Sequence, residues 1–174
     1  MNNTIRTIIL VAVFIGIAVF AYLNFFSSDE SGKVKDITTL EHIDGGESID
    51  LTNYLGKKKL ILHFVAVPCD CCSYTIPYNK ELVAEQDEIE VVTVVFNGKK
   101  STIRKKFEEY NLNYPWGLDL DKSISSHYGV STSPTYVFFD EEGNHLGNYP
   151  YVISDKENLI QAYQSALDEF QQGK

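Results

Sequence analysis

Residues 60–73 read Leu-Ile-Leu-His-Phe-Val-Ala-Val-Pro-Cys-Asp-Cys-Cys-Ser, an apolar stretch followed by three closely spaced cysteines. Its first eight residues form a nearly continuous apolar run of strand length, which is typical of a central strand covered on both faces. From Cys69 to about Gln86 the sequence predicts a helix. Pro77 is expected to kink this helix, because proline lacks the amide donor and clashes with the preceding turn.

Further strands and helices are predicted on the carboxyl-terminal side. Ile89 to Phe96 is rich in valine and predicts a second central strand. Thr135 to Phe139 is also strand-like, and a turn at residues 142–144 leads to another strand at residues 146–152. Apolar residues at helical spacing predict two amphipathic helices, one with Ile103, Phe107 and Tyr110, and one with Leu159, Tyr163, Ala166, Leu167 and Phe170.

Local signals complete the expected order of elements. Ser154 and Glu157 stand in capping-box register and predict the start of the last helix. Short alternating stretches around Gly45 and Gly46 predict a small hairpin between residues 37 and 55. The order strand, helix, strand, helix, strand, strand, helix matches a thioredoxin-like α/β fold, in which helices flank a mixed central sheet.

The charge of the chain argues against nucleic-acid binding. The 174 residues include 24 acidic and 15 basic side chains, for a formal net charge of −9, and a chain of this charge repels phosphates. Five basic residues gather at Lys99, Lys100, Arg104, Lys105 and Lys106. Their spacing suits the solvated face of a helix, so we assign them no function.

The long apolar run from Thr7 to Phe26 approaches the roughly 20 residues that a membrane-spanning helix needs. Arg6 precedes it and acidic residues follow it, so the positive-inside rule places residues 1–6 in the cytoplasm and the domain outside. We therefore expect a single-pass anchor in the cell membrane at residues 7–26, a linker at 27–36 and a thioredoxin-like domain at 37–174. A cleaved signal peptide is the alternative, but its apolar core is usually only about 7–15 residues long.

Cys69, Cys71 and Cys72 lie within four positions, and disulfides that close such short loops constrain a fold very little. The cluster therefore points to chemistry. Cys69 precedes a helix, whose unpaired amides and dipole favour a thiolate, so we expect Cys69 to be the attacking sulfur. Cys72 comes one turn later on nearly the same side and is expected to resolve a mixed disulfide on Cys69.

Two other interpretations of the cluster stay open. Free cysteines often serve as small buried hydrophobes, although three in four positions are unusual for that role. Neighbouring thiolates also bind soft ions such as Cu(I) or zinc. Because the sequence has no second Cys-x-x-Cys and its four histidines are scattered, we predict no metal site.

Several short motifs are spread along the domain: Leu62-His63-Phe64, Cys69 with Cys72, Pro77, Tyr114-Pro115 with Leu118-Asp119, Tyr128-Gly129-Val130 and Ser133-Pro134-Thr135. Together they resemble the membrane-anchored thioredoxin-like thiol-disulfide oxidoreductases of the TlpA/ResA type. The resemblance covers Ile37 to the carboxyl end. It implies reduction of disulfides in extracytoplasmic protein clients, as in cytochrome c maturation, with electrons from a membrane thiol donor and no bound cofactor.

The resemblance also implies a supporting role for Ser133 and Pro134. The proline at this position is expected to be cis and to pack against the cysteine pair, leaving a strand-like backbone edge on which a partner docks. Two residues depart from the family pattern. Pro68 stands where tryptophan is usual, and Cys71 stands where proline often separates the cysteines. Cys71 is either a spare, exposed thiol or a competitor for Cys69, since a bond between Cys71 and Cys72 would be strained.

His63 and Asp70 are further supporting residues. His63 lies beneath the motif, where thioredoxin carries a buried acid, and a neutral imidazole there can accept the Cys72 proton as a general base. The alternative is a core histidine with one satisfied hydrogen bond. The charge of Asp70 is expected to oppose thiolate formation on Cys69.

Three functions follow from these residues. The leading hypothesis is disulfide reduction by Cys69 and Cys72. The second is a metallochaperone that carries copper on the three cysteines, and the third is a catalytically silent domain that binds partners through its docking edge.

Trp116 and Tyr114 are interpreted as packing residues.

Overall fold

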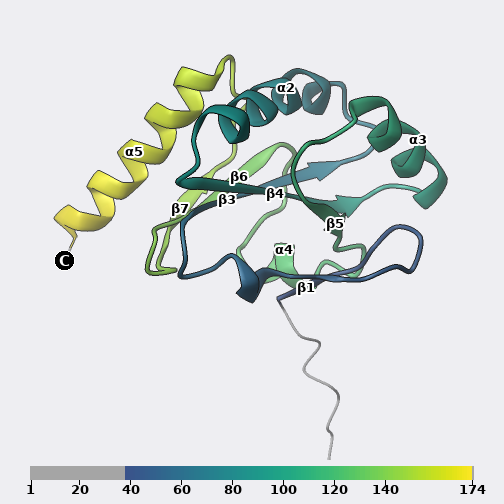
Figure 1. Cartoon of the computed structure of the whole chain (residues 1–174), viewed down its shortest axis with the longest axis horizontal. Helices are drawn as coiled ribbons and strands as arrows, with labels where there is room; N and C mark the ends of the chain where they lie inside the picture. Colours follow the sequence, from purple (N-terminus) through teal and green to yellow (C-terminus); the bar gives the residue numbers. More distant parts are fainter. Residues whose placement is uncertain (1–37, 174) are drawn as a thin grey trace, which may run out of the picture. The chain divides into compact units, whose positions relative to one another are not determined.

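The computed structural model describes residues 38–173, which form a mixed five-stranded sheet between two layers (Figure 1). The strand order is β5-β4-β3-β6-β7. The strands are β3 (Lys59–Ala66), β4 (Ile89–Asn97), β5 (Trp116–Leu118), β6 (Thr135–Phe139) and β7 (His145–Tyr149). Strands β3, β4 and β5 are parallel, and β6 and β7 continue the sheet in antiparallel pairing. The predicted thioredoxin-like α/β architecture is confirmed.

The middle position of β3 follows from its sequence. Successive side chains of a strand point to opposite faces, and β3 is buried on both. Leu62 and Phe64 enter one apolar cluster, whereas Ile61 enters a second cluster on the other face. Burying a side chain of this size contributes roughly 1.5–3 kcal/mol. A strand with two apolar faces is therefore most stable in the centre of the sheet.

Three helices cover one face of the sheet: α2 (Asp70–Glu85), α3 (Lys100–Tyr110) and α5 (Lys156–Gln172). Leu82 of α2 and Leu159 of α5 pack in the same cluster as Ile61. Ile103 of α3 packs beside Cys72 in a third cluster. The amino end of α2, where the cysteines lie, is thus held between β3 and α3.

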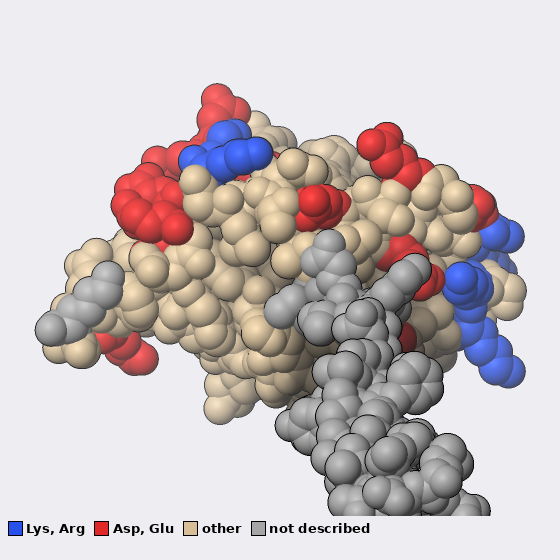
Figure 2. All heavy atoms as spheres, turned by 90° about the horizontal axis from the view of Figure 1, so that it is seen from below, with Lys and Arg blue, Asp and Glu red and all other residues tan. Residues whose placement is uncertain are grey.

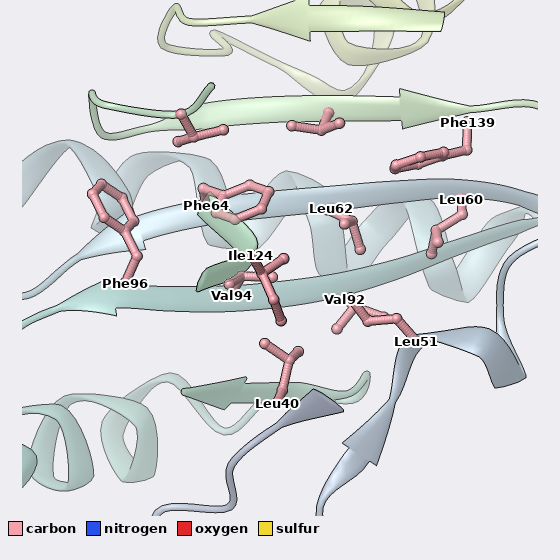
Figure 3. Close-up of a cluster of buried hydrophobic side chains, with 12 residues drawn as sticks. Leu40, Leu51, Leu60, Leu62, Phe64, Val92, Val94, Phe96, Ile124 and Phe139 are labelled. Carbon is pink, nitrogen blue, oxygen red and sulfur yellow. The ribbon is translucent and has the colours of Figure 1, made fainter. Parts of the chain in front are cut away.

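The other face is covered by shorter elements. These are the antiparallel pair β1 (Thr39–Leu40) and β2 (Ile49–Asp50), the 3-10 helix η1 (Leu51–Asn53) and helix α4 (Ser123–His127). Figure 3 shows Leu40, Leu51 and Ile124 meeting the side chains of β3 and β4. The predicted hairpin is confirmed. It lies so close to β5 that a Cβ atom at Gly117 would come within 2.7 Å of Leu40 Cβ.

The basic cluster predicted to be solvated is on the surface, at and around α3. Arg104 forms an ion pair with Asp44, Lys100 with Glu41 at 3.9 Å and Lys106 with Glu109 at 3.1 Å. In Figure 2 the acidic and basic side chains of the described residues are scattered over the face seen from below. The positive charges of the cluster are therefore partly neutralised by nearby carboxylates.

Three details differ from the sequence-based expectations. β5 and α4 were not predicted, because three and five residues are too few to show a periodic pattern. The last strand ends at Tyr149 rather than at residue 152. The expected capping box is wrong: Asp155 is the N-cap of α5, and its side chain accepts a hydrogen bond from the backbone N–H of Asn158 at 2.7 Å.

The apolar run at residues 7–26 and the linker at 27–36 lie outside the described residues. Within residues 38–173, every helix is too short or too polar to cross a lipid bilayer.

Candidate redox site

The cysteines lie at the point where β3 ends and α2 begins. Cys69 is the N-cap of α2, with extended backbone angles (φ −140°, ψ 117°), and Asp70 is the first helical residue. Cys69 and Cys71 are half-buried, Asp70 is exposed and Cys72 is only 2% exposed. The predicted strand-to-helix junction is therefore confirmed, and it places one cysteine below the surface and two near it.

The structure joins Cys69 to Cys71 in a disulfide, with 5.3 Å between their Cα atoms, and leaves Cys72 as a free thiol. Of the two alternatives for Cys71, this bond fits a competitor for Cys69 rather than a spare thiol. A separation of 5.3 Å lies within the usual range for disulfides. All three sulfur atoms lie within 4.8 Å of one another, so Cys72 stays near the bond. The catalytic roles of Cys69 and Cys72 remain predictions.

The Cys72 thiol points to the protein interior. Its Sγ lies 3.5 Å from Ser133 Oγ and 3.7 Å from the carbonyl oxygen of Ala66. Ser133 Oγ also accepts a hydrogen bond from the backbone N–H of Ala66 at 2.9 Å. Burial raises the pKa of Cys72, and the hydrogen bond with Ser133 opposes this rise. Cys72 is thus a shielded thiol with one hydroxyl placed to stabilise its anion.

The loop before β6 forms the other side of the site. The Ser133–Pro134 peptide bond is cis, as predicted, and Pro134 is buried. The carbonyl oxygen of Ser133 lies 3.6 Å from Cys71 Sγ. Ser133 therefore contacts two of the three sulfurs, one through its main chain and one through its side chain. A second cis bond, between Val67 and Pro68, was not predicted.

His63 is fully buried in β3, and both of its ring nitrogens have partners. Asn79 Nδ2 donates to Nδ1 at 2.9 Å, so Nε2 carries the proton and donates to Thr75 Oγ1 at 3.3 Å. The Thr75 hydroxyl in turn donates to the carbonyl oxygen of Cys72 at 3.3 Å. The imidazole ring stacks on Tyr136 with 4.5 Å between centroids. His63 thus reaches the main chain of Cys72 through Thr75.

The electrostatics of His63 favour the core-histidine alternative. Burial lowers its pKa from 6.5 to about 3, so the imidazole is neutral near pH 7. Its Nδ1 lone pair is already used by Asn79. A role as general base stays a prediction, and these contacts support positioning of the first turn of α2 instead.

Sequence reasoning missed the polar cluster around His63. Its members are Thr75, Asn79, Thr93, Tyr114 and Tyr136. Burial raises the pKa of Tyr114 above its ordinary value of 10.0. A signal for two of the members was present, because Thr75 and Asn79 share the spacing of Cys72 and Leu82 on the buried face of α2. Tyr114 is therefore more than the packing residue we expected.

Known proteins share both sequence and architecture with this chain. The thiol-disulfide oxidoreductase ResA of Geobacillus thermodenitrificans is 28% identical over 143 residues, which cover 79% of this chain and 81% of that protein. The exposed lipoprotein thioredoxin Etrx1 of Streptococcus pneumoniae superimposes with a TM-score of 0.62 at 27% identity, covering 73% of this chain and 97% of the other.

A third relative is similar in fold alone. A secreted disulfide oxidoreductase of Mycobacterium tuberculosis superimposes with a TM-score of 0.63 at 19% identity, covering 75% of this chain and 98% of the other. The family model described as Redoxin matches residues 29–166, which is most of the chain. With a buried strand leading into a cysteine-capped helix beside a cis proline, the chain belongs to the Redoxin family.

Proposed function

We propose that this thiol-disulfide oxidoreductase reduces disulfides of extracytoplasmic protein clients through attack by Cys69 and resolution by Cys72. The observation that carries the proposal is the meeting of three sulfur atoms within 4.8 Å at the amino end of α2. The similarity to ResA, a thiol-disulfide oxidoreductase, supports the reaction class.

The reaction starts from the reduced site. The Cys69 thiolate attacks one sulfur of the client disulfide, a mixed disulfide forms, and the second client sulfur leaves as a thiolate. A second thiol of the site then attacks Cys69 Sγ and releases the first client sulfur. Two electrons pass to the client, and the site is left as a disulfide.

The position of Cys69 suits the first step. It is half-buried, so a client sulfur can reach it, whereas Cys72 is almost fully covered. Cys69 is the N-cap of α2, and the carbonyl of Cys69 accepts a hydrogen bond from the N–H of Cys72 at 3.2 Å, so the residue lies at the first turn of the helix. The positive end of the helix dipole there stabilises a thiolate.

The relatives and the sequence support a position of the domain outside the cytoplasm. The solved relatives include a secreted protein and an exposed lipoprotein. Together with the apolar run at residues 7–26, they support a single-pass anchor with the domain outside the cytoplasm. A membrane thiol donor on the same side would then return the site to the dithiol form, and maturation of cytochrome c is one setting for such clients.

Client trapping tests the proposal. The full-length chain carrying both Cys71→Ala and Cys72→Ala has no resolving thiol, so a client should stay covalently bound to Cys69. The adduct should disappear on treatment with dithiothreitol and should not form when Cys69 is also replaced by Ala. Failure to recover any mixed disulfide from cells that express the double variant would contradict disulfide exchange.

Copper carriage is the second candidate, and the same three sulfurs favour it. Three thiolates at this separation are a donor set suited to Cu(I), which prefers soft ligands. Reduced protein should then retain one Cu(I) per chain against a competing chelator, and replacement of Cys71 should weaken retention. Cu(I) binding without client trapping would favour carriage, and the absence of both would leave a partner-binding domain.

A further inference from the structure

The site contains three cysteines, although disulfide reduction needs only two, one that attacks and one that resolves. Cys69 is bonded to Cys71, while the free Cys72 thiol lies within 4.8 Å of both. Cys69 therefore has two sulfur neighbours within the same first turn of α2. A site of this kind can close in two ways.

We propose that Cys71 is a third redox-active residue, and that the oxidised site exchanges between a Cys69–Cys71 and a Cys69–Cys72 disulfide. The inference deepens the proposed function and rests on it for its biological meaning, although the exchange itself needs no client.

The exchange step balances without any further reactant. The Cys72 thiolate attacks Cys69 Sγ, the Cys69–Cys72 bond forms, the Cys69–Cys71 bond breaks, and Cys71 leaves as a thiolate that takes up the proton lost by Cys72. No electron enters or leaves the site. Thiol–disulfide exchange follows this route whenever a thiolate can reach a disulfide sulfur.

Ser133 provides an acceptor for the free thiol in each form. With Cys69–Cys71 closed, the Cys72 thiol lies beside Ser133 Oγ and the carbonyl of Ala66. In this same form the carbonyl oxygen of Ser133 lies 3.6 Å from Cys71 Sγ, so a Cys71 thiol released in place would have an acceptor beside it. The free thiol has a hydrogen-bond acceptor in both forms. Changing from one disulfide to the other therefore leaves no buried thiol without a hydrogen bond.

The two forms differ in what an external thiol can reach. Both residues of the Cys69–Cys71 bond are half-buried, whereas Cys72 is buried. Access governs the rate of attack on a disulfide. The Cys69–Cys71 form therefore exposes two sulfurs to a thiol reductant, and the Cys69–Cys72 form exposes one. Cys71 also provides a second route for resolving a mixed disulfide on Cys69.

Ellman's reagent tests this second route on the purified full-length chain without any client. It loads Cys69 with a thionitrobenzoate group, and a neighbouring thiol expels this group as it closes the disulfide. We expect Cys72→Ala to end as an adduct-free protein lighter by two hydrogen atoms. Cys71→Ala should give the same mass, whereas the double variant should keep the group on Cys69.

A Cys72→Ala variant that retains the adduct as fully as the double variant would overturn the proposal. A second measurement uses the oxidised wild type. The free thiol is alkylated and then located by fragmentation between Cys71 and Cys72. Alkyl groups on both residues are expected, and an alkyl group confined to Cys72 at every pH would refute the exchange.

These readouts are independent of client reduction. If the adduct stays on Cys69 in Cys72→Ala but the wild type still reduces clients, the exchange fails and the proposed function stands. If both single variants close but no client is reduced, the exchange stands and the proposed function fails.

Discussion

Cys72 Sγ lies 3.5 Å from Ser133 Oγ, although the two residues are 61 positions apart in the chain. The contact joins the amino end of α2 to the loop before β6. The Ser133 hydroxyl can accept from the Cys72 thiol and can donate to the Cys72 thiolate once the thiol has lost its proton.

Replacing Ser133 by Ala should raise the pKa of Cys72, because burial then acts without the opposing hydrogen bond. A hydrogen bond to a charged group contributes about 1.5 kcal/mol, which corresponds to a roughly tenfold smaller fraction of Cys72 thiolate at a pH below its pKa. The measurement is the pH dependence of Cys72 alkylation in a Cys69→Ala, Cys71→Ala background. Ser133→Thr keeps a hydroxyl and serves as the matched control. An unchanged titration in Ser133→Ala would show that the contact is without effect.

His63 should make the fold sensitive to acid. Its folded pKa, about 3, lies below the ordinary value of 6.5, so the unfolded chain binds more protons between these values. The stabilisation is complete above about pH 6.5 and is lost as the pH falls towards 3. Between about pH 7 and pH 5 the loss amounts to about 2 kcal/mol.

Urea unfolding at these two pH values measures the effect. The wild type should lose about 2 kcal/mol more than His63→Gln, because glutamine does not titrate in this range. His127→Gln is the control, since His127 is exposed on α4. Equal losses in wild type and His63→Gln would mean that His63 does not stay neutral in the fold.

The cap of α5 gives a prediction on stability. Asp155 accepts a hydrogen bond from the N–H of Asn158, so Asp155→Ala should lower the free energy of unfolding by about 1 kcal/mol. Ser154 is not the N-cap, and Ser154→Ala should change the free energy of unfolding by less than about 0.5 kcal/mol. Urea titrations of the two variants compare these effects. A larger loss of unfolding free energy in Ser154→Ala than in Asp155→Ala would show that Ser154, and not Asp155, caps α5.

The long elements could be predicted because their patterns are strong. β3 and β4 are buried on both faces and appear in the sequence as largely apolar runs, interrupted within the buried part only by His63 in β3 and by Glu90 and Thr93 in β4. β5 and α4 are too short to show a pattern of their own, and contacts with neighbouring elements stabilise them. The close approach of Gly117 in β5 to Leu40 is one such contact. At the start of α5, serine and aspartate are adjacent and cap equally well, so only the backbone path separates them.

The site could be predicted in position but not in pairing. The cysteines, the cis bond at Pro134 and the burial of His63 follow from a strand that leads into a helix and from the resemblance. Which sulfur bonds to Cys69 depends on side-chain directions within one turn, and sequence does not specify them. The polar cluster is equally hidden, because it joins His63 of β3 to side chains from α2, β4, β6 and the residue two before β5.

Attack by Cys69 is tested most directly in a single-turnover reaction with a peptide closed by one disulfide. Fully reduced full-length protein is mixed with excess peptide, and the peptide thiols are counted after acid quenching. We expect two peptide thiols released per protein chain in the wild type and none in Cys69→Ala. Equal release by Cys69→Ala would contradict it, because the attacking sulfur would then lie elsewhere.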